Sequence, residues 1–196
     1  NLSGFQDILT NIIFFFVSIF IFIFSIGPEK ETISLMGIGI IWTLLLLSST
    51  LSLRKFYQDD FDNGNLLIMH LNGFSFGFIS ILKTISNFIF VQMPFLFSIP
   101  IASILLNVEN EKFIYLFTSF ALGSLILSCL GSISSSMNLM NQRNFLLGSV
   151  IVMIFSVPII IFSVGIINAD ESFNSLISVL FGILLIVFAI NPWASG

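Results

Sequence analysis

The residue types that most often carry metal or redox chemistry occur here one at a time. His70 is the single histidine and Cys129 is the single cysteine. A lone histidine can be an axial ligand of a metal cofactor or a proton carrier, but His70 precedes the turn pair Asn72-Gly73, where a surface histidine is the simpler interpretation. Cys129 lies within an apolar run, where a thiol usually packs as a small apolar side chain. We therefore expect no catalytic residue and no metal ligand in this chain.

The sequence also contains no recognisable nucleotide site. In a P-loop, a glycine directly precedes the phosphate-binding lysine. The four lysines follow glutamate, arginine or leucine instead (Lys30, Lys55, Lys83 and Lys112). The net charge of −4 provides no basic patch for nucleic acid. Any dependence on ATP is therefore expected to come from a partner protein that binds it.

The composition places the chain in a membrane. Of the 196 residues, 57% are hydrophobic and 8% are charged, and the mean hydropathy is +1.11. An ordinary soluble domain is about 25% charged. Six Lys and Arg with ten Asp and Glu are too few to cover a globule of this size. This excludes a water-soluble enzyme and indicates a surface that faces lipid.

Six apolar segments are long enough to cross a bilayer as helices, because a hydrocarbon core of about 30 Å needs about 20 helical residues. They contain no charged side chain, and they do not alternate as the strands of a membrane β-barrel do. We expect an all-α protein with one transmembrane domain over residues 1–196, trimmed at both ends. The six predicted helices cover residues 8–26, 35–53, 84–106, 113–137, 145–167 and 173–190.

The charged residues lie in the connections between these helices, and the cations predict the orientation. Connections on one side carry four cations and those on the other side carry two. The positive-inside rule then places the long connection, residues 54–83, and both termini in the cytoplasm. The two sets are Arg54, Lys55, Lys83 and Arg143 against Lys30 and Lys112.

The fourth predicted helix carries small residues at a spacing of four. This spacing lets helix backbones approach closely and allows hydrogen bonds between helices. We expect this helix to pack centrally in the bundle, with a contact between subunits as the alternative. The small residues are Ser124, Ser128, Ser132 and Ser136, with the pairs Ser119/Gly123 and Gly131/Ser135.

Prolines mark two other helices as able to bend. Pro94 and Pro100 lie inside the third predicted helix, and Pro158 lies inside the fifth. Each proline lacks the N–H group of one helical hydrogen bond and favours a kink. These positions are candidate hinges of a transporter, although such kinks are common in membrane helices.

The long connection contains a candidate amphipathic helix. Phe56, Tyr57 and Phe61 are spaced for one helical face, and Asn63-Gly64 is a suitable end. The apolar run 66–69 is too short to span a membrane, so it should lie at the interface or dock on a protein. Two interpretations stay open, a helix resting on lipid headgroups and a coupling helix that receives force from a soluble subunit. The coupling candidates are Phe56, Tyr57, Asp59, Asp60, Phe61, Asp62 and Gly64.

Several residues and short motifs are distributed along the whole chain: Gly27-Pro28-Glu29, Gly39-Ile40-Ile41-Trp42, residues 59–64, Lys83, Pro94, Gly123, Gly131, Arg143 and Pro158. Their order and spacing resemble the CcmB family, the haem exporter B subunit of cytochrome c maturation. The sequence departs from the family pattern at Leu67, where glutamate is typical, at Gly73, where proline is common, and at Asn87-Phe88, where His-Trp is frequent. The loss of the histidine argues against an essential haem ligand at position 87.

The resemblance implies the membrane half of an ABC-type complex with an ABC-2-type permease fold. Its expected partners are a cytoplasmic CcmA-like ATPase that binds ATP, a haem-handling CcmC-like protein and a small one-span CcmD-like protein. It further implies haem handled by the complex, a homodimer as one arrangement, and a bacterial inner membrane, or the mitochondrial inner membrane in an organelle.

Three other functions compete with this interpretation. An ABC-2-type exporter of lipid or glycan would share the fold, and a passive scaffold could hold a haem-handling protein in place. An ion-driven carrier is disfavoured, because such carriers keep ionisable residues within their spans and none occurs in the six segments predicted here.

Overall fold

The computed structural model of the chain describes residues 2–27, 29–52, 56–140, 145–168 and 173–195. Within these ranges every regular element is a helix, and six helices are long and apolar enough to cross a membrane. The all-α membrane fold with six spans is therefore confirmed. The elements are α1 (Leu2–Ile26), α2 (Lys30–Ser52), α3 (Gln58–Asp62), α4 (Asn65–Leu71), α5 (Phe76–Asn87), the π-helical turn η2 (Phe88–Gln92), α6 (Met93–Leu105), α7 (Asn110–Met140), α8 (Phe145–Asn168) and α9 (Phe173–Ser195).

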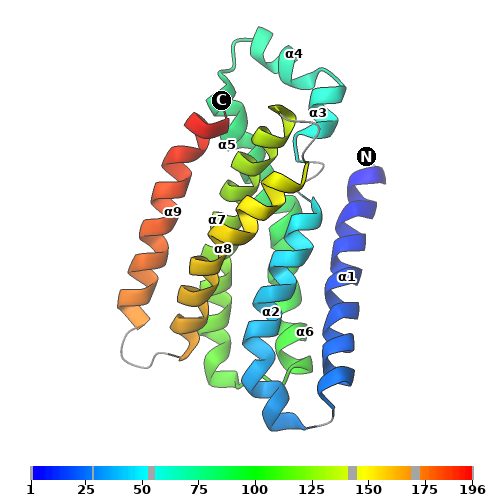
Figure 1. Cartoon of the computed structure of the whole chain (residues 1–196), viewed down its shortest axis with the longest axis vertical. Helices are drawn as coiled ribbons and strands as arrows, with labels where there is room; N and C mark the ends of the chain where they lie inside the picture. Colours follow the sequence, from blue (N-terminus) through cyan, green and yellow to red (C-terminus); the bar gives the residue numbers. More distant parts are fainter. Residues whose placement is uncertain (1, 28, 53–55, 141–144, 169–172, 196) are drawn as a thin grey trace.

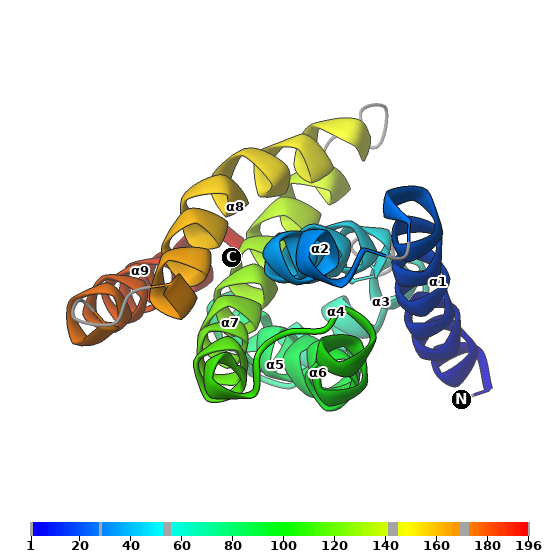
Figure 2. The same cartoon turned by 90° about the horizontal axis from the view of Figure 1, so that it is seen from below.

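The long helices run side by side along the bundle, and the short helices α3 and α4 lie across one end (Figure 1). Both chain ends lie at this same end, as an even number of crossings requires. Seen along the bundle, α7 lies among the other helices (Figure 2), and it contacts α2, α5, α6, α8 and α9. The helix with the small-residue spacing is therefore the central one.

Large apolar side chains fill the interior and also cover the outside. Phe15, Trp42, Phe95 and Phe120 are fully buried. The ring centroids of Phe15 and Phe95 lie 5.5 Å apart, and those of Trp42 and Phe120 also lie 5.5 Å apart. Leucine, isoleucine and phenylalanine side chains are exposed along the outer faces of the helices, as lipid requires.

The third span, Phe76–Leu105, is formed by α5, η2 and α6 together. It begins earlier than the sequence predicted. The helix starts at Phe76, not at Thr84, and Ser75 caps it by accepting a hydrogen bond from the N–H of Phe78 at 3.2 Å. Lys83 therefore lies on the helix and not in the connection. The prediction stopped at this charge, whereas residues on both sides of it are mostly apolar and helical. The charge of Lys83 has a carboxylate partner, described below.

The predicted proline positions differ in their local structure. Pro94 is the second residue of α6, just after η2, and its missing N–H leaves the carbonyl of Phe90 without the usual helical donor, which accounts for the wider turn at this point. Helices α6 and α8 continue through Pro100 and Pro158. The side chain of Ser98 donates to the carbonyl of Pro94 at 2.8 Å. Irregular hydrogen bonding is thus concentrated in the third span.

Candidate coupling site

The segment between α2 and α5 folds as two short helices that share a tight turn. Helix α3 ends at Asp62, and Gly64 has a positive φ of 70°, a conformation that glycine adopts without strain. The Asn63 side chain donates to the carbonyl of Asp59 at 2.6 Å and fixes the turn. We call residues 56–75 the α3–α4 segment; Arg54 and Lys55 lie outside the described residues.

The aromatic residues of this segment do not share one face, contrary to the prediction. Phe56 and Tyr57 are 7% and 5% exposed, whereas Phe61 is 48% exposed. The reason is that α3 begins only at Gln58, so the first two aromatic residues lie in the preceding turn and point into the bundle. Phe61 lies on α3 and faces outward.

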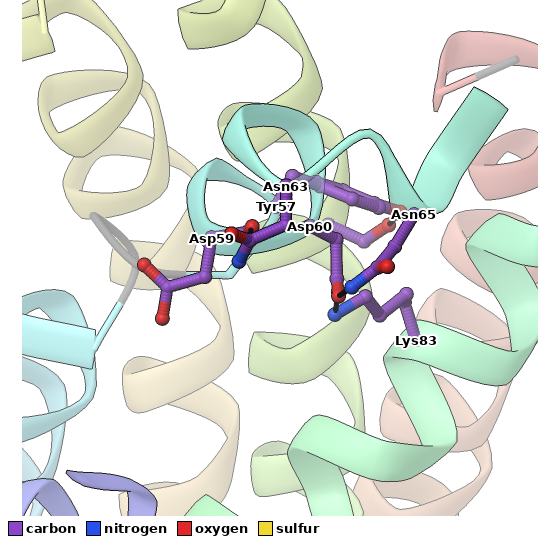
Figure 3. Close-up of polar contacts among 7 residues, drawn as sticks. Tyr57, Asp59, Asp60, Asn63, Asn65 and Lys83 are labelled. Atoms are coloured by element: carbon purple, nitrogen blue, oxygen red, sulfur yellow. Dashed lines mark hydrogen bonds and ion pairs between the residues drawn. The ribbon is translucent and has the colours of Figure 1, made fainter. Parts of the chain in front are cut away.

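An ion pair attaches α3 to the third span (Figure 3). The Lys83 ammonium group binds the Asp60 carboxylate, and the side chain of Asn65 donates to the same carboxylate at 3.1 Å. Partial burial on its own would raise the pKa of Asp60. The hydrogen bonds from Lys83 and Asn65 and the charge of Lys83 outweigh it and hold the pKa below the ordinary value of 3.8. The carboxylate of Asp60 is therefore ionised at neutral pH.

A second attachment is buried and uncharged. The hydroxyl oxygens of Tyr57 and Ser132 lie 2.7 Å apart, and Ser132 lies 3.3 Å from the hydroxyl of Ser80. Ser80 donates to the amide oxygen of Asn191 at 3.2 Å, and the amide nitrogen of Asn191 donates to Thr84 at 2.8 Å. This buried network therefore joins the α3–α4 segment to α7, α5 and α9.

The small residues of α7 face the inside of the chain. Ser124, Ser128 and Ser132 are fully buried, and Gly131 is buried beside them. The side chain of Asn87 donates to the hydroxyl of Ser128 at 3.2 Å. The spacing thus serves packing and hydrogen bonds within the subunit, where α5 lies against α7.

The outer surface of the segment is apolar and acidic. Leu67, Ile68 and Leu71 of α4 are 60%, 55% and 76% exposed, and Asp59 and Asp62 of α3 are also exposed. An exposed apolar cluster on a surface that is also charged is typical of an interaction site.

The two residues considered for metal or redox chemistry, His70 and Cys129, have surroundings that fit a structural role. The ring of His70 stacks on Phe76 with centroids 4.1 Å apart, and its Nδ1 atom lies 3.1 Å from the carbonyl oxygen of Phe74. Cys129 is buried in α7 and reduced. Among the described residues, no three His, Cys, Asp or Glu side chains are grouped so that they could hold a metal ion.

Sequence reasoning missed Ser80, Thr84, Lys83 and Asn191 as parts of this site. A signal was present, because positions 80, 84 and 87 are spaced for one helical face and are all polar in an otherwise apolar helix. The contribution of Asn191 gave no local signal, since its partners lie more than 100 residues away in the sequence.

The chain has six apolar helices around a hydrogen-bonded interior, and a short segment is bound across one end. This arrangement defines a multi-pass helical membrane protein. The sequence model described as "CcmB protein" matches residues 3–196, so the chain belongs to the CcmB family.

Proteins similar to this chain include "Heme exporter protein B" of Haemophilus influenzae, which is 26% identical over 191 residues, or 96% of this chain and 86% of that protein. The protein of the same name from Bradyrhizobium diazoefficiens is 25% identical over 192 residues, with the same two coverages. That of Paracoccus denitrificans is 29% identical over 178 residues, or 88% of this chain and 81% of that protein.

Proposed function

We propose that this chain is the membrane subunit of a haem exporter that acts in cytochrome c maturation. The match to the CcmB family over residues 3–196 carries this proposal, supported by relatives named heme exporter protein B that align along most of their length. In this role haem is the substrate of the complex, and the chain contributes membrane helices and no reaction chemistry.

ATP is bound and hydrolysed by a separate CcmA-like subunit. The absence of a P-loop motif from the sequence supports this division of labour. The complex also contains a haem-handling CcmC-like protein and a one-span CcmD-like protein. Two ATPase subunits present two docking surfaces, which favours a homodimer of this chain or its pairing with another membrane subunit.

The end of the bundle that carries α3 and α4 lies in the cytoplasm of a bacterium, and the span helices cross its inner membrane. Lys83 lies at this end, whereas Lys30 and Lys112 begin helices at the opposite end. Arg54, Lys55 and Arg143 lie outside the described residues; the sequence pattern alone predicts them on the side of Lys83. The positive-inside rule supports this orientation.

The α3–α4 segment is the docking surface for the ATPase. Its exposed face combines apolar side chains with Asp59 and Asp62, and Asp60 is already paired. The cytoplasmic leaflet carries negative charge and repels exposed carboxylates. A soluble protein is therefore a better partner for this face than lipid headgroups.

The double substitution Leu67→Ser and Leu71→Ser tests the docking surface. Full burial of a leucine contributes about 1.5–3 kcal/mol, and about 1.4 kcal/mol is a tenfold change in an equilibrium constant. Loss of two should lower the amount of ATPase that co-purifies with the chain in mild detergent by at least about tenfold. The measurement is the ratio of ATPase to this subunit in the eluate.

Ile104→Ser is the matched control, because Ile104 is also highly exposed but lies near the opposite end of the bundle. This variant should retain the ATPase. Full recovery of the ATPase with the double variant would overturn the assignment of the docking surface, and it would favour a segment that rests on lipid.

A further inference from the structure

We propose that the hydroxyl group of Tyr57 transmits the motion of the α3–α4 segment to the membrane helices, through its hydrogen bond with Ser132. This inference rests on the proposed function, because it assumes that an ATPase moves the segment. It assigns positioning roles to Tyr57, Ser132, Ser80 and Asn191, which the docking surface does not include.

Tyr57 connects the α3–α4 segment to the interior of the bundle. The residue belongs to the segment that faces the partner, yet its side chain is 5% exposed and reaches α7. The distance of 2.7 Å between its hydroxyl oxygen and that of Ser132 is optimal for an O–H···O hydrogen bond. A displacement of the segment must therefore move Ser132 or break this bond.

The hydrogen bonds of the network have a defined direction. The amide oxygen of Asn191 can only accept, so Ser80 donates its single hydrogen to Asn191. Ser80 then accepts from Ser132, and Ser132 accepts from Tyr57. The donors thus run in one direction, from the segment through α7 and α5 to α9.

Breaking this series of hydrogen bonds is costly because it lies in a dry interior. Ser80, Ser132 and Asn191 are buried at about 1% exposure or less. A buried polar group that loses its partner has no water to replace it. The linked groups therefore favour a joint displacement of the segment and the three helices over a local rupture.

The ion pair of Asp60 with Lys83 cannot serve in place of this network. It joins α3 to α5 alone, and both side chains are about one quarter exposed, so water can replace either partner. The hydroxyl network reaches α7, which contacts α2, α5, α6, α8 and α9. Motion delivered to Ser132 is thus delivered to the helix that packs against most of the bundle.

The substitution Tyr57→Phe tests the inference, because it removes one oxygen atom and leaves the docking face unchanged. In cells that depend on this chain, the yield of c-type cytochrome per assembled complex should fall about five- to tenfold, the range that corresponds to loss of one hydrogen bond. The ratio of co-purified ATPase to this subunit should stay within about twofold of the unsubstituted chain.

Tyr115→Phe is the matched control. Tyr115 is the other tyrosine, it lies on α7 in contact with the ring of Phe173, and it is outside the network. This variant should form cytochrome normally. Normal cytochrome formation with Tyr57→Phe would overturn the inference, as would a parallel loss of the ATPase, which would show that the hydroxyl only supports docking.

Ser132→Ala examines the other end of the same bond. It should show at least the defect of Tyr57→Phe, because it also removes the bond with Ser80. The double variant should be no worse than Ser132→Ala alone, because both substitutions remove the bond between Tyr57 and Ser132. Ser119→Ala is its control, since Ser119 is buried on α7 but bonds only with the carbonyl of Leu116 among the contacts described. Additive defects would contradict transmission through this bond.

The outcomes for docking and transmission are distinguishable. Loss of the ATPase with the α4 double variant, together with normal cytochrome formation by Tyr57→Phe, would leave the proposed function standing and reject the transmission role. Retention of the ATPase with the α4 double variant would reject the docking surface, whatever Tyr57→Phe does.

Discussion

Gly123 sets the distance between α2 and α7 at the level of single residues. The ring of Trp42 lies where a Cβ atom on Gly123 would be, and Trp42 is fully buried against Phe120. A glycine is therefore required at this position for close packing, which is the role that small residues at a spacing of four have between membrane helices.

Gly123→Ala should destabilise the protein by about 1–3 kcal/mol, the usual cost of overpacking a well-packed core. Gly39→Ala is the matched control on α2, because no atom lies within 4 Å of the Cβ that it would add. The measurement is the midpoint of thermal unfolding in detergent. Equal midpoints for the two variants would contradict the packing role of Gly123.

At the level of elements, the length of the apolar runs was enough to predict the six spans. It was not enough to predict where the third span begins. A run of apolar residues specifies a membrane helix through composition, so all six were found from the sequence. The start of α5 was missed because the prediction ended the apolar run at Lys83, whose charge is paired with Asp60 of α3. The partners of the Ser124, Ser128 and Ser132 row were also hidden, since Tyr57 lies 75 residues from Ser132 along the chain.

Exchange of the charges, with Asp60→Lys and Lys83→Asp together, tests this pairing between elements. Each single substitution places two like charges in contact and should expose the α3–α4 segment to proteolysis, whereas the double substitution should restore protection. A partly exposed ion pair contributes about 0.2–1 kcal/mol, so the single variants should be cleaved about two- to fivefold faster. Protection that stays low in the double variant would contradict the pairing.

The pH dependence of this attachment follows from the lowered pKa of Asp60. A carboxylate whose pKa is lower in the folded state stabilises it above the unfolded pKa, and this contribution is lost as the pH falls through the folded pKa. With an ordinary value of 3.8 as the upper limit, the ion pair should be lost only in acid below that pH. Protease protection of the segment should therefore be equal at about pH 6 and pH 8.

The whole molecule buries many of its polar side chains and exposes many of its apolar ones. Leu35 and Phe24 are 85% and 82% exposed, while the serines of α7 are fully buried. This arrangement is stable only where the exterior is lipid, because water would leave the large apolar surface exposed. Helix α4 lies across one end of the bundle (Figure 1), and its side chains Leu67, Ile68 and Leu71 are exposed. The docking proposal therefore depends on which side of the membrane α4 lies.

Site-specific labelling decides this orientation. Cys129→Ala removes the single cysteine, which is buried, and Leu71→Cys or Glu31→Cys then introduces one exposed thiol at either end of the bundle. A membrane-impermeant maleimide should label Glu31→Cys in spheroplasts and Leu71→Cys only after the membrane is opened. Labelling of Leu71→Cys in intact spheroplasts would place α4 outside the cytoplasm. An ATP-hydrolysing partner could not reach it there, and the docking and transmission proposals would both fail.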